Sequence, residues 1–314
     1  MASPLTYIFL GSPELAATIL SRLVKEKGAP LLVVTQEAKQ AGRGNKMTTT
    51  AVEDTALRLN LPLLRTSNVN ESSVLAQIQA LNPDLFLVAA FGQIFKEPLL
   101  AIPKRYCLNV HTSLLPKYRG AAPIQWALYQ GDPITGVSIQ KMVKKLDAGD
   151  ILVQKQIGIA PEDTTESLLT KLAELGAEAL LEGFQQIESG VERFTPQDET
   201  AVSFAPKIDK SHAVIDWKRE ARAIHNQVRA LQPWPVAETK LGSEGLKVYR
   251  TRVVPGNPEH PPGTVVTDAK TRLVVQCGDG SALSLEELQL QSRKRLPISQ
   301  FLAGYRGQFP FSRL

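Results

Sequence analysis

The first 110 residues alternate short apolar runs with stretches in which apolar residues recur at helical spacing. Four runs have strand length and are predominantly apolar: residues 6–10, 31–34, 84–90 and 107–110. Between them, apolar positions near residues 15–23, 51–59 and 74–81 recur every three or four residues, as on a helix with one buried face. Strands that are apolar on both faces and separated by helices predict a parallel, doubly wound α/β sheet. The polar residues 35–50 are expected to form a loop.

The pattern changes after a long amphipathic helix, which is predicted for residues 164–187. A polar stretch follows and predicts a linker. A further helix is predicted over residues 220–231, ended by Pro233. Short candidate strands then recur between Gly, Pro and Asp turns, at residues 247–250, 263–266, 272–277 and 282–285. This spacing is typical of a small β-barrel. We therefore expect an N-terminal domain over residues 1–190, a linker over 191–208 and a C-terminal domain over 209–314.

Composition is that of an ordinary soluble globular protein, with 43% apolar and 21% charged residues among 314. The N-terminal residues lack a basic and apolar leader, and no later run is long enough to span a bilayer, so we expect a cytoplasmic protein. The two cysteines are far apart and the four histidines show no ligand spacing. Neither a disulfide framework nor a metal site is expected.

The formal net charge of +5 is concentrated toward the C-terminus. From Lys207 onward the chain has 17 Lys and Arg against 10 Asp and Glu, whereas acidic residues slightly outnumber basic ones before it. A basic region beside a near-neutral one favours a polyanionic partner for the C-terminal domain. Charge alone is also compatible with a basic surface that only keeps the protein in solution.

Asn109 and His111 are two residues apart at the end of a predicted strand. Their side chains therefore point to the same face, at the carboxyl edge where open α/β sheets bind ligands. An amide that donates a hydrogen bond beside a titratable imidazole can polarise a carbonyl while a proton moves. A lone histidine is more often a satisfied core residue, but its spacing from Asn109 favours a catalytic site.

Asp147 lies in a turn signal between two strand-like runs. By composition it is a turn former. A carboxylate that came back near His111 would orient the imidazole and favour its charged form, but sequence spacing does not show that proximity. The basic loop that contains Arg43 and Lys46 follows the second predicted strand. Such a loop is either only solvated or binds an anion such as phosphate or RNA.

A nucleotide-dependent oxidoreductase is the first alternative for such a sheet. The turn after the first predicted strand has Gly11 alone, without a G-x-G-x-x-G pattern, and the chain has no phosphate-loop lysine motif. Binding of NAD or ATP in the usual way is therefore disfavoured.

The motif Asn109-x-His111-x-Ser-Leu-Leu-Pro, with Asp147 in Asp-x-Gly-Asp, resembles the folate-dependent formyltransferases. The continuation over residues 119–125 is similar to the methionyl-tRNA formyltransferase branch of that family. Three further features agree with this branch: the Ala-Gly-Arg-Gly loop at 41–44, the Pro-Trp-Pro segment at 233–235 and the Gly-Asp-Gly turn at 278–280. The resemblance covers essentially the whole chain.

The resemblance implies a Rossmann-like, mostly parallel catalytic domain followed by a C-terminal OB-like β-barrel that suits a nucleic-acid backbone. It also implies a reaction, in which the α-amino group of methionine on initiator Met-tRNA attacks the formyl carbon of 10-formyltetrahydrofolate. Asn109 would donate a hydrogen bond to the oxyanion, His111 would stabilise it or relay protons, and Asp147 would orient and charge the imidazole. An oxyanion donor contributes ~3–4 kcal/mol, and acid–base catalysis roughly 10²–10⁴-fold.

Binding residues also follow from the resemblance. The expected folate-site residues are Ser113, Leu114, Leu115, Pro116, Phe91, Gly92 and Ile94, the last three in a segment that acts largely through backbone groups. The expected tRNA-binding residues are Arg43, Lys46 and Lys207. The expected partners are initiator Met-tRNA and folate, without a membrane or a metal, and the chain is expected to be a monomer.

Three alternative functions remain. A formyltransferase that acts on an amino-sugar nucleotide would share the site, although the Ala-Ala-Pro-Ile-Gln stretch at 121–125 and the 41–44 loop argue against it. Hydrolysis of formyl-folate would leave a basic RNA-binding domain without a role. A non-catalytic RNA-binding protein on a degenerate transferase fold would be expected to have lost Asn109, His111 or Asp147, and all three are present.

Overall fold

The computed structural model describes residues 5–41 and 46–305. The chain folds into two compact units, each assembled from separate stretches of sequence. Unit 1 comprises residues 1–123, 134–158 and 169–205, and unit 2 comprises 124–133, 159–168 and 206–314. The predicted domain boundaries divide the chain differently. They stay a prediction, because a compact packing unit need not coincide with an independently folding domain.

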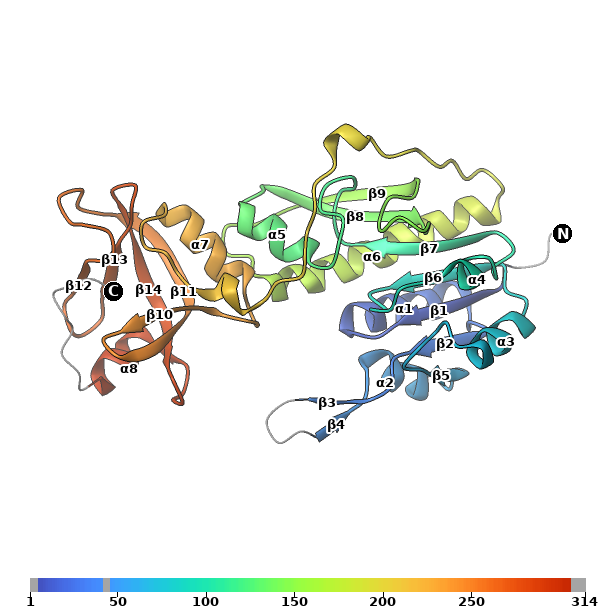
Figure 1. The fold of residues 1–314 in the computed structure, drawn as a ribbon, viewed down its shortest axis with the longest axis horizontal. Helices are drawn as coiled ribbons and strands as arrows, with labels where there is room; N and C mark the ends of the chain where they lie inside the picture. Colours follow the sequence, from blue (N-terminus) through green and yellow to red (C-terminus); the bar gives the residue numbers. More distant parts are fainter. Residues whose placement is uncertain (1–4, 42–45, 306–314) are drawn as a thin grey trace. The chain divides into compact units, whose positions relative to one another are not determined.

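A seven-stranded sheet forms the centre of unit 1 (Figure 1). Its strands are β1 (Tyr7–Gly11), β2 (Leu32–Thr35), β5 (Leu63–Arg65), β6 (Leu85–Ala89), β7 (Tyr106–His111), β8 (Ile134–Lys141) and β9 (Ile151–Gly158). Their spatial order is β5-β2-β1-β6-β7-β8-β9. The first five strands of this order pair in parallel, and β8 and β9 continue the sheet antiparallel. The predicted mostly parallel α/β sheet is confirmed.

Helices cover both faces of this sheet, which explains why its central strands are apolar throughout. The helices of unit 1 are α1 (Glu14–Lys27), α2 (Ala51–Arg58), α3 (Ser72–Ala80), α4 (Glu97–Leu100) and most of α6 (Thr165–Glu188). On one face, Ile8 of β1 shares an apolar cluster with Ile78 of α3. The preceding residue, Tyr7, contacts Phe184 of α6 edge to face at 5.8 Å. Successive strand residues thus face opposite helical layers.

A glycine on α6 lets this helix approach the strand that carries the candidate site. A Cβ at Gly176 would lie 3.0 Å from Val110 Cγ1 on β7. Any larger side chain there would push helix and strand apart, because protein interiors are close-packed. Helix α6, which was predicted for residues 164–187, therefore packs closely against β7.

The segment 35–50, predicted to be a polar loop, contains two short strands. β3 (Lys39–Ala41) and β4 (Lys46–Thr48) pair antiparallel as a separate two-stranded sheet. This pairing was missed because three-residue polar strands are held by backbone hydrogen bonds and show no alternation of apolar side chains. The segment ends where the Thr50 hydroxyl accepts a hydrogen bond from the Glu53 N–H at 3.0 Å, which caps α2.

Unit 2 is built on an antiparallel sheet, orange to red in Figure 1. Its strands are β10 (Ala237–Leu241), β11 (Glu244–Pro255), β12 (Val265–Thr267), β13 (Leu273–Gln276), β14 (Ser281–Leu290) and β15 (Leu296–Pro297). The order is β10-β11-β14-β13-β12, with β15 beside β14. The predicted series of short strands is confirmed as an antiparallel sheet. Its closure into an OB-like barrel stays a prediction, because the pairing order leaves β10 and β12 at its two ends.

The remaining helices are α5 (Pro123–Gln130), α7 (Ala221–Ala230), α8 (Ile298–Gly304) and the 3₁₀ turns η1 (Glu199–Ala201) and η2 (Lys210–Ala213). Helix α7 buries Ile224 and Val228 in the core that the sheet of unit 2 forms. Within the described part of the chain, no helix combines the length and apolar character that a membrane span requires.

Candidate active site

The candidate site lies in unit 1, at the carboxyl ends of β6 and β7. Val88 of β6 pairs in parallel with Asn109 of β7, and His111 is the last residue of β7, opposite Ser138 of β8. Because parallel strands end at the same edge, the segments that follow β6 and β7 leave the sheet side by side. This is the edge at which open α/β sheets bind ligands.

Asn109 is half-buried, and its side-chain amide has no hydrogen-bond partner within residues 5–41 and 46–305. Its neighbour across the sheet, Gln140 of β8, is 1% exposed. The Gln140 Oε1 atom is also buried without a partner in the described structure. A buried amide oxygen without a partner is costly unless a ligand or water satisfies it, and with the unpaired Asn109 amide beside it this oxygen indicates a polar binding site.

One ring nitrogen of His111 is hydrogen-bonded to the protein backbone, and the other can take up or release a proton. Its Nε2 lies 2.9 Å from the backbone carbonyl oxygen of Tyr118. A carbonyl only accepts hydrogen bonds, so Nε2 carries the hydrogen and Nδ1 is left to take or release a proton. Nδ1 faces Oδ2 of Asp147 at 3.7 Å, and both side chains are at least nine-tenths buried.

Asp147 lies in the turn between β8 and β9 and comes back to His111, which sequence spacing could not show. Its carboxylate accepts hydrogen bonds from the Gly120 N–H at 2.9 Å and from Gln140 Nε2 at 2.8 Å. These two donors orient the carboxylate so that Oδ2 faces the imidazole. The structure thus brings Asn109, His111 and Asp147 together in one site.

The sequence prediction missed Gln140. Thr135 and Ser138 of β8 are buried polar residues as well, so the polarity of Gln140 alone gave no distinguishing signal. Its role becomes visible only through the β7–β8 pairing, because that pairing sets it beside Asn109.

The turn Ser113–Pro116, predicted to line a folate site, is held firmly from within. The Ser113 hydroxyl donates to the Lys117 carbonyl at 2.7 Å, and the Leu115 N–H donates to Ser138 Oγ at 3.0 Å. Ser113 and Leu115 are buried, whereas Leu114 and Pro116 are half-buried. Side-chain contact with a ligand is therefore open to Leu114 and Pro116 and not to the Ser113 hydroxyl, which is already bonded.

The segment after β6 presents its residues unequally. Phe91 is 2% exposed and packs edge to face on Phe95 at 5.9 Å, so only its backbone can reach a ligand. Gly92 is exposed with φ of 77°, and Ile94 is 83% exposed. An exposed apolar side chain near the exposed backbone of Gly92 is suited to a flat heterocycle that has apolar faces and polar edges.

This segment also lies against the loop that carries Asp147. Lys144 Nζ is 3.1 Å from Glu97 Oε1, at the start of α4. Met142 packs on the same apolar cluster as Phe91. The unpaired Asn109 amide, the exposed Ile94 and this loop therefore share one edge of unit 1.

The structure describes few contacts of the residues that are predicted to bind tRNA. Arg43 lies outside the described residues, and Lys46 is described only as the first backbone position of β4. Lys207 is exposed near the start of the last stretch of unit 2. Their proposed contacts therefore rest on sequence.

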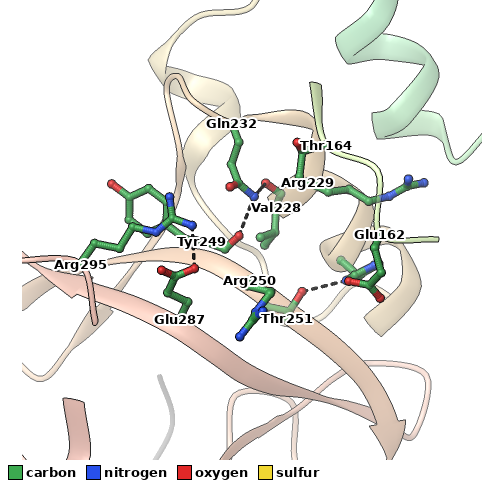
Figure 2. Close-up of a pocket in the computed structure, with 11 residues that line it drawn as sticks. Glu162, Thr164, Val228, Arg229, Gln232, Tyr249, Arg250, Thr251, Glu287 and Arg295 are labelled. Atoms are coloured by element: carbon green, nitrogen blue, oxygen red, sulfur yellow. Dashed lines mark hydrogen bonds and ion pairs between the residues drawn. The ribbon is translucent and has the colours of Figure 1, made fainter. Parts of the chain in front are cut away.

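A separate pocket lies within unit 2, between α7, β11 and the residues before α6 (Figure 2). Arg295 and Arg229 lie at opposite sides of it (Figure 2). Arg295 pairs with Glu287 at 2.6 Å, and Arg229 Nη1 donates to the carbonyls of Ala160 and Asp163 at 3.4 and 3.3 Å. The charges of Arg295 and Arg229 in this pocket are therefore already engaged by other groups of unit 2.

The metal-ligating and thiol side chains of the described residues are dispersed or buried. The residues that it describes contain no cluster of three or more His, Cys, Asp or Glu side chains suited to a metal. Burial raises the pKa of Cys107 and raises the pKa of Cys277 to about 12, so both thiols are poor nucleophiles.

Comparison with known protein families gives two matches in order along the chain. Residues 5–183 match the family described as formyl transferase, and residues 207–306 match the formyl transferase C-terminal domain. Methionyl-tRNA formyltransferase of Geobacter metallireducens is 42% identical over 302 residues, which cover 96% of each chain. Methionyl-tRNA formyltransferase of Staphylococcus aureus is 39% identical over 297 residues, 95% of each chain.

Solved structures share the fold at low identity. WlaRD, a sugar 3N-formyl transferase determined in the presence of dTDP and 5-N-formyl-THF, has a TM-score of 0.69 at 18% identity and covers 93% of this chain and 100% of that one. HypX of Aquifex aeolicus in complex with tetrahydrofolic acid has a TM-score of 0.62 at 16% identity, and this chain spans 47% of its length. With both family domains matched in order and relatives near 40% identical along almost the whole length, this chain belongs to the formyl transferase family.

Proposed function

We propose that this protein transfers the formyl group of 10-formyltetrahydrofolate to the α-amino group of methionine on initiator Met-tRNA, which yields formyl-Met-tRNA for translation initiation. The observation that supports this substrate is the sequence identity of 39–42% to methionyl-tRNA formyltransferases over nearly the full chain, C-terminal region included. The excess of basic residues beyond Lys207 supports a nucleic-acid partner.

Asn109 is the oxyanion donor in this proposal. When bound, 10-formyltetrahydrofolate supplies the electrophilic formyl carbon, and negative charge develops on the formyl oxygen as the amine attacks. The Asn109 amide has no hydrogen-bond partner among the described residues and lies at the edge where open α/β sheets bind ligands, so it can donate to that oxygen without first breaking another bond.

His111, assisted by Asp147, takes up the proton that the attacking amine loses in this proposal. The attacking amine must lose a proton, which Nδ1 of His111 would accept and would pass to N10 of the departing tetrahydrofolate as the bond between N10 and the formyl carbon breaks. Asp147 Oδ2, 3.7 Å away, stabilises the imidazolium, and the Tyr118 carbonyl keeps the ring in one orientation. Gln140 and Gly120 serve the same end, because they orient the Asp147 carboxylate.

The binding residues extend this proposal. Phe91, Gly92 and Ile94 with the Ser113–Pro116 turn would contact the folate, and the exposed Ile94 supports a packing role against its ring system. Arg43, Lys46 and Lys207 would contact tRNA. A monomeric state and a cytoplasmic location stay predictions.

The test is an acceptor comparison with 10-formyltetrahydrofolate as donor. We expect formyl transfer to initiator Met-tRNA and not to elongator Met-tRNA. Transfer to an amino-sugar nucleotide instead would keep the chemistry and overturn the proposed substrate. Release of formate without any acceptor would indicate hydrolysis, and absence of both reactions would contradict the proposal as a whole.

A further inference from the structure

The turn that carries Asp147 is held from outside by the polar stretch after α6. Asp147 has φ of 49°, in the left-handed region that a non-glycine residue keeps only when its surroundings hold it there. Gln197 supplies the hold on the backbone. Its Nε2 donates to the Asp147 carbonyl at 2.9 Å and to the Gly149 carbonyl at 2.7 Å. The sequence pattern of this stretch predicts only a linker.

The orientation of Gln197 is fixed in turn by a buried arginine. Nε and Nη2 of Arg119 both donate to Gln197 Oε1, at 3.0 and 2.8 Å. An amide rotated by 180° would set its N–H groups against the guanidinium and its oxygen against the two turn carbonyls. The Arg119 pair therefore forces the Gln197 N–H groups toward the Asp147 turn.

Arg119 also belongs to a ring of contacts that returns, through Glu199, to the loop that carries Asp147. Arg119 Nη2 also donates to Glu199 Oε1 at 2.8 Å, and Lys145 Nζ, two residues before Asp147, lies 2.8 Å from Glu199 Oε2. The hydrogen bond from Arg119 lowers the pKa of Glu199 to about 2, so the ring keeps its charges at neutral pH.

Arg119 sits between the two residues that contact the catalytic pair. Tyr118 accepts from His111 through its carbonyl, and Gly120 donates to Asp147 through its N–H. The polar stretch also holds Arg119 by its backbone: the Arg119 N–H donates to the Ser203 carbonyl at 2.9 Å, and the Ala205 N–H donates to the Arg119 carbonyl at 2.8 Å. One segment thus reaches both members of the pair.

We propose that Arg119 and Gln197 are positioning residues, which fix the turn of Asp147 relative to His111 and thereby set the rate of formyl transfer. The proposal deepens the proposed function and rests on it. A purely stabilising role explains the arrangement less well. Arg119 is 1% exposed, its Nη1 has no partner in the described structure, and its counter-charge is a largely exposed glutamate. Such a buried ion contributes little net stability.

The first test replaces Gln197 with an isosteric residue. Gln197→Glu keeps the acceptor for Arg119 and removes both donors to the turn. We expect kcat to fall by up to about 10²-fold, the size that misplacement of a catalytic group by about 1 Å can cause, with KM for both substrates within about 3-fold. The matched control is Gln185→Glu, the same change at an exposed position of α6, which we expect to leave both constants unchanged. Unchanged kcat in Gln197→Glu would overturn the proposal.

A double mutant separates positioning from general destabilisation. If Gln197 acts through Asp147, Gln197→Glu causes no further loss of kcat in an Asp147→Asn background. Losses that multiply would show that Gln197 acts independently of Asp147 and would overturn the proposal.

Hydrogen exchange tests the hold on the turn without any activity. We expect backbone amides of residues 144–150 to exchange faster in Gln197→Glu than in the unchanged protein, and those of β1 to exchange as before. If the unchanged protein failed to formylate Met-tRNA, the proposed function would fall while faster exchange would still support this restraint. Unaltered exchange at 144–150 would contradict it.

Discussion

The edge of the unit 1 sheet and the pocket of unit 2 both collect polar side chains, but they differ in how these are paired. At the unit 1 edge, the Asn109 amide and Gln140 Oε1 lack partners in the described structure, while the groups around them are tightly bonded. In unit 2, Arg295 pairs with Glu287 and His225 Nδ1 lies 2.9 Å from Thr251 Oγ1. The two regions therefore differ in how their polar groups are paired, and on the proposed function the unpaired groups mark the place of the chemistry.

Apart from loss of His111 itself, the largest expected effect follows removal of the unpaired Asn109 amide. Asn109→Ala should lower kcat for formyl transfer by about 10²–10³-fold, because an oxyanion donor acts mainly on the transition state. KM for 10-formyltetrahydrofolate should change little. Steady-state kinetics at saturating tRNA measure both constants. A raised KM with unchanged kcat would mean that Asn109 only binds substrate.

Two glycines with positive φ, one in each unit, test whether the backbone near the candidate site is more constrained than a turn of unit 2. Gly120 has φ of 126°, and a Cβ there would lie 2.6 Å from the Ala205 carbonyl oxygen. Gly242 has φ of 61° with nothing within 4 Å. Gly120→Ala should destabilise by about 3 kcal/mol, from strain plus the clash, and Gly242→Ala by about 1 kcal/mol, from strain alone. Urea unfolding measures both, and equal losses would contradict the difference.

The charge of Lys207 should affect tRNA binding but not the rate of formyl transfer. Removing one phosphate contact should reduce the slope of log affinity against log salt by about 1. Lys207→Ala should therefore weaken Met-tRNA binding a few-fold at low salt, with kcat unchanged at saturation. Lys25→Ala, the same change on the exposed end of α1, is the control. An unaltered salt slope in Lys207→Ala would remove Lys207 from the tRNA path.

The smallest expected effect is a pH dependence of stability in unit 2. Burial lowers the pKa of His225, with Arg229 and Arg222 adding to the shift and Glu162 opposing it. His225 binds a proton more readily in the unfolded chain, where its pKa has the ordinary value of 6.5, than in the folded protein. The stability that neutral His225 contributes is therefore full above that pH and is lost as pH falls.

His225→Gln should therefore flatten the loss of stability between about pH 7.5 and about pH 5.5, as measured by urea unfolding. His260→Gln serves as the control, because His260 lies in a Pro-rich stretch and does not line the pocket that contains His225. A pH profile identical to that of the unchanged protein would argue against a neutral buried His225.

The parts of the fold that depend on local pattern could be predicted from the sequence. Apolar runs predicted β1, β2, β6 and β7, and the helical stripe from Leu15 to Leu23 predicted α1. The pair β3 and β4 and the antiparallel direction of β8 and β9 could not be predicted, because backbone pairing decides them and leaves no period in the side chains.

The candidate site divides in the same way. The spacing of Asn109 and His111 already places both on one face of a strand end. The approach of Asp147 depends on the turn after β8, and the contact of Gln197 with that turn spans about 50 residues of chain. Contacts between segments so far apart follow from tertiary packing, which a single sequence does not display.

The most direct test of the account compares the two regions in one experiment. Single-turnover formyl transfer to saturating initiator Met-tRNA is measured for the unchanged protein, for His111→Ala at the unit 1 edge and for Arg295→Ala in the unit 2 pocket. The account predicts a rate lowered by about 10²–10⁴-fold in His111→Ala and within about 3-fold of the unchanged protein in Arg295→Ala. A lowered rate in Arg295→Ala with an unaffected His111→Ala would place the chemistry in unit 2 and contradict it.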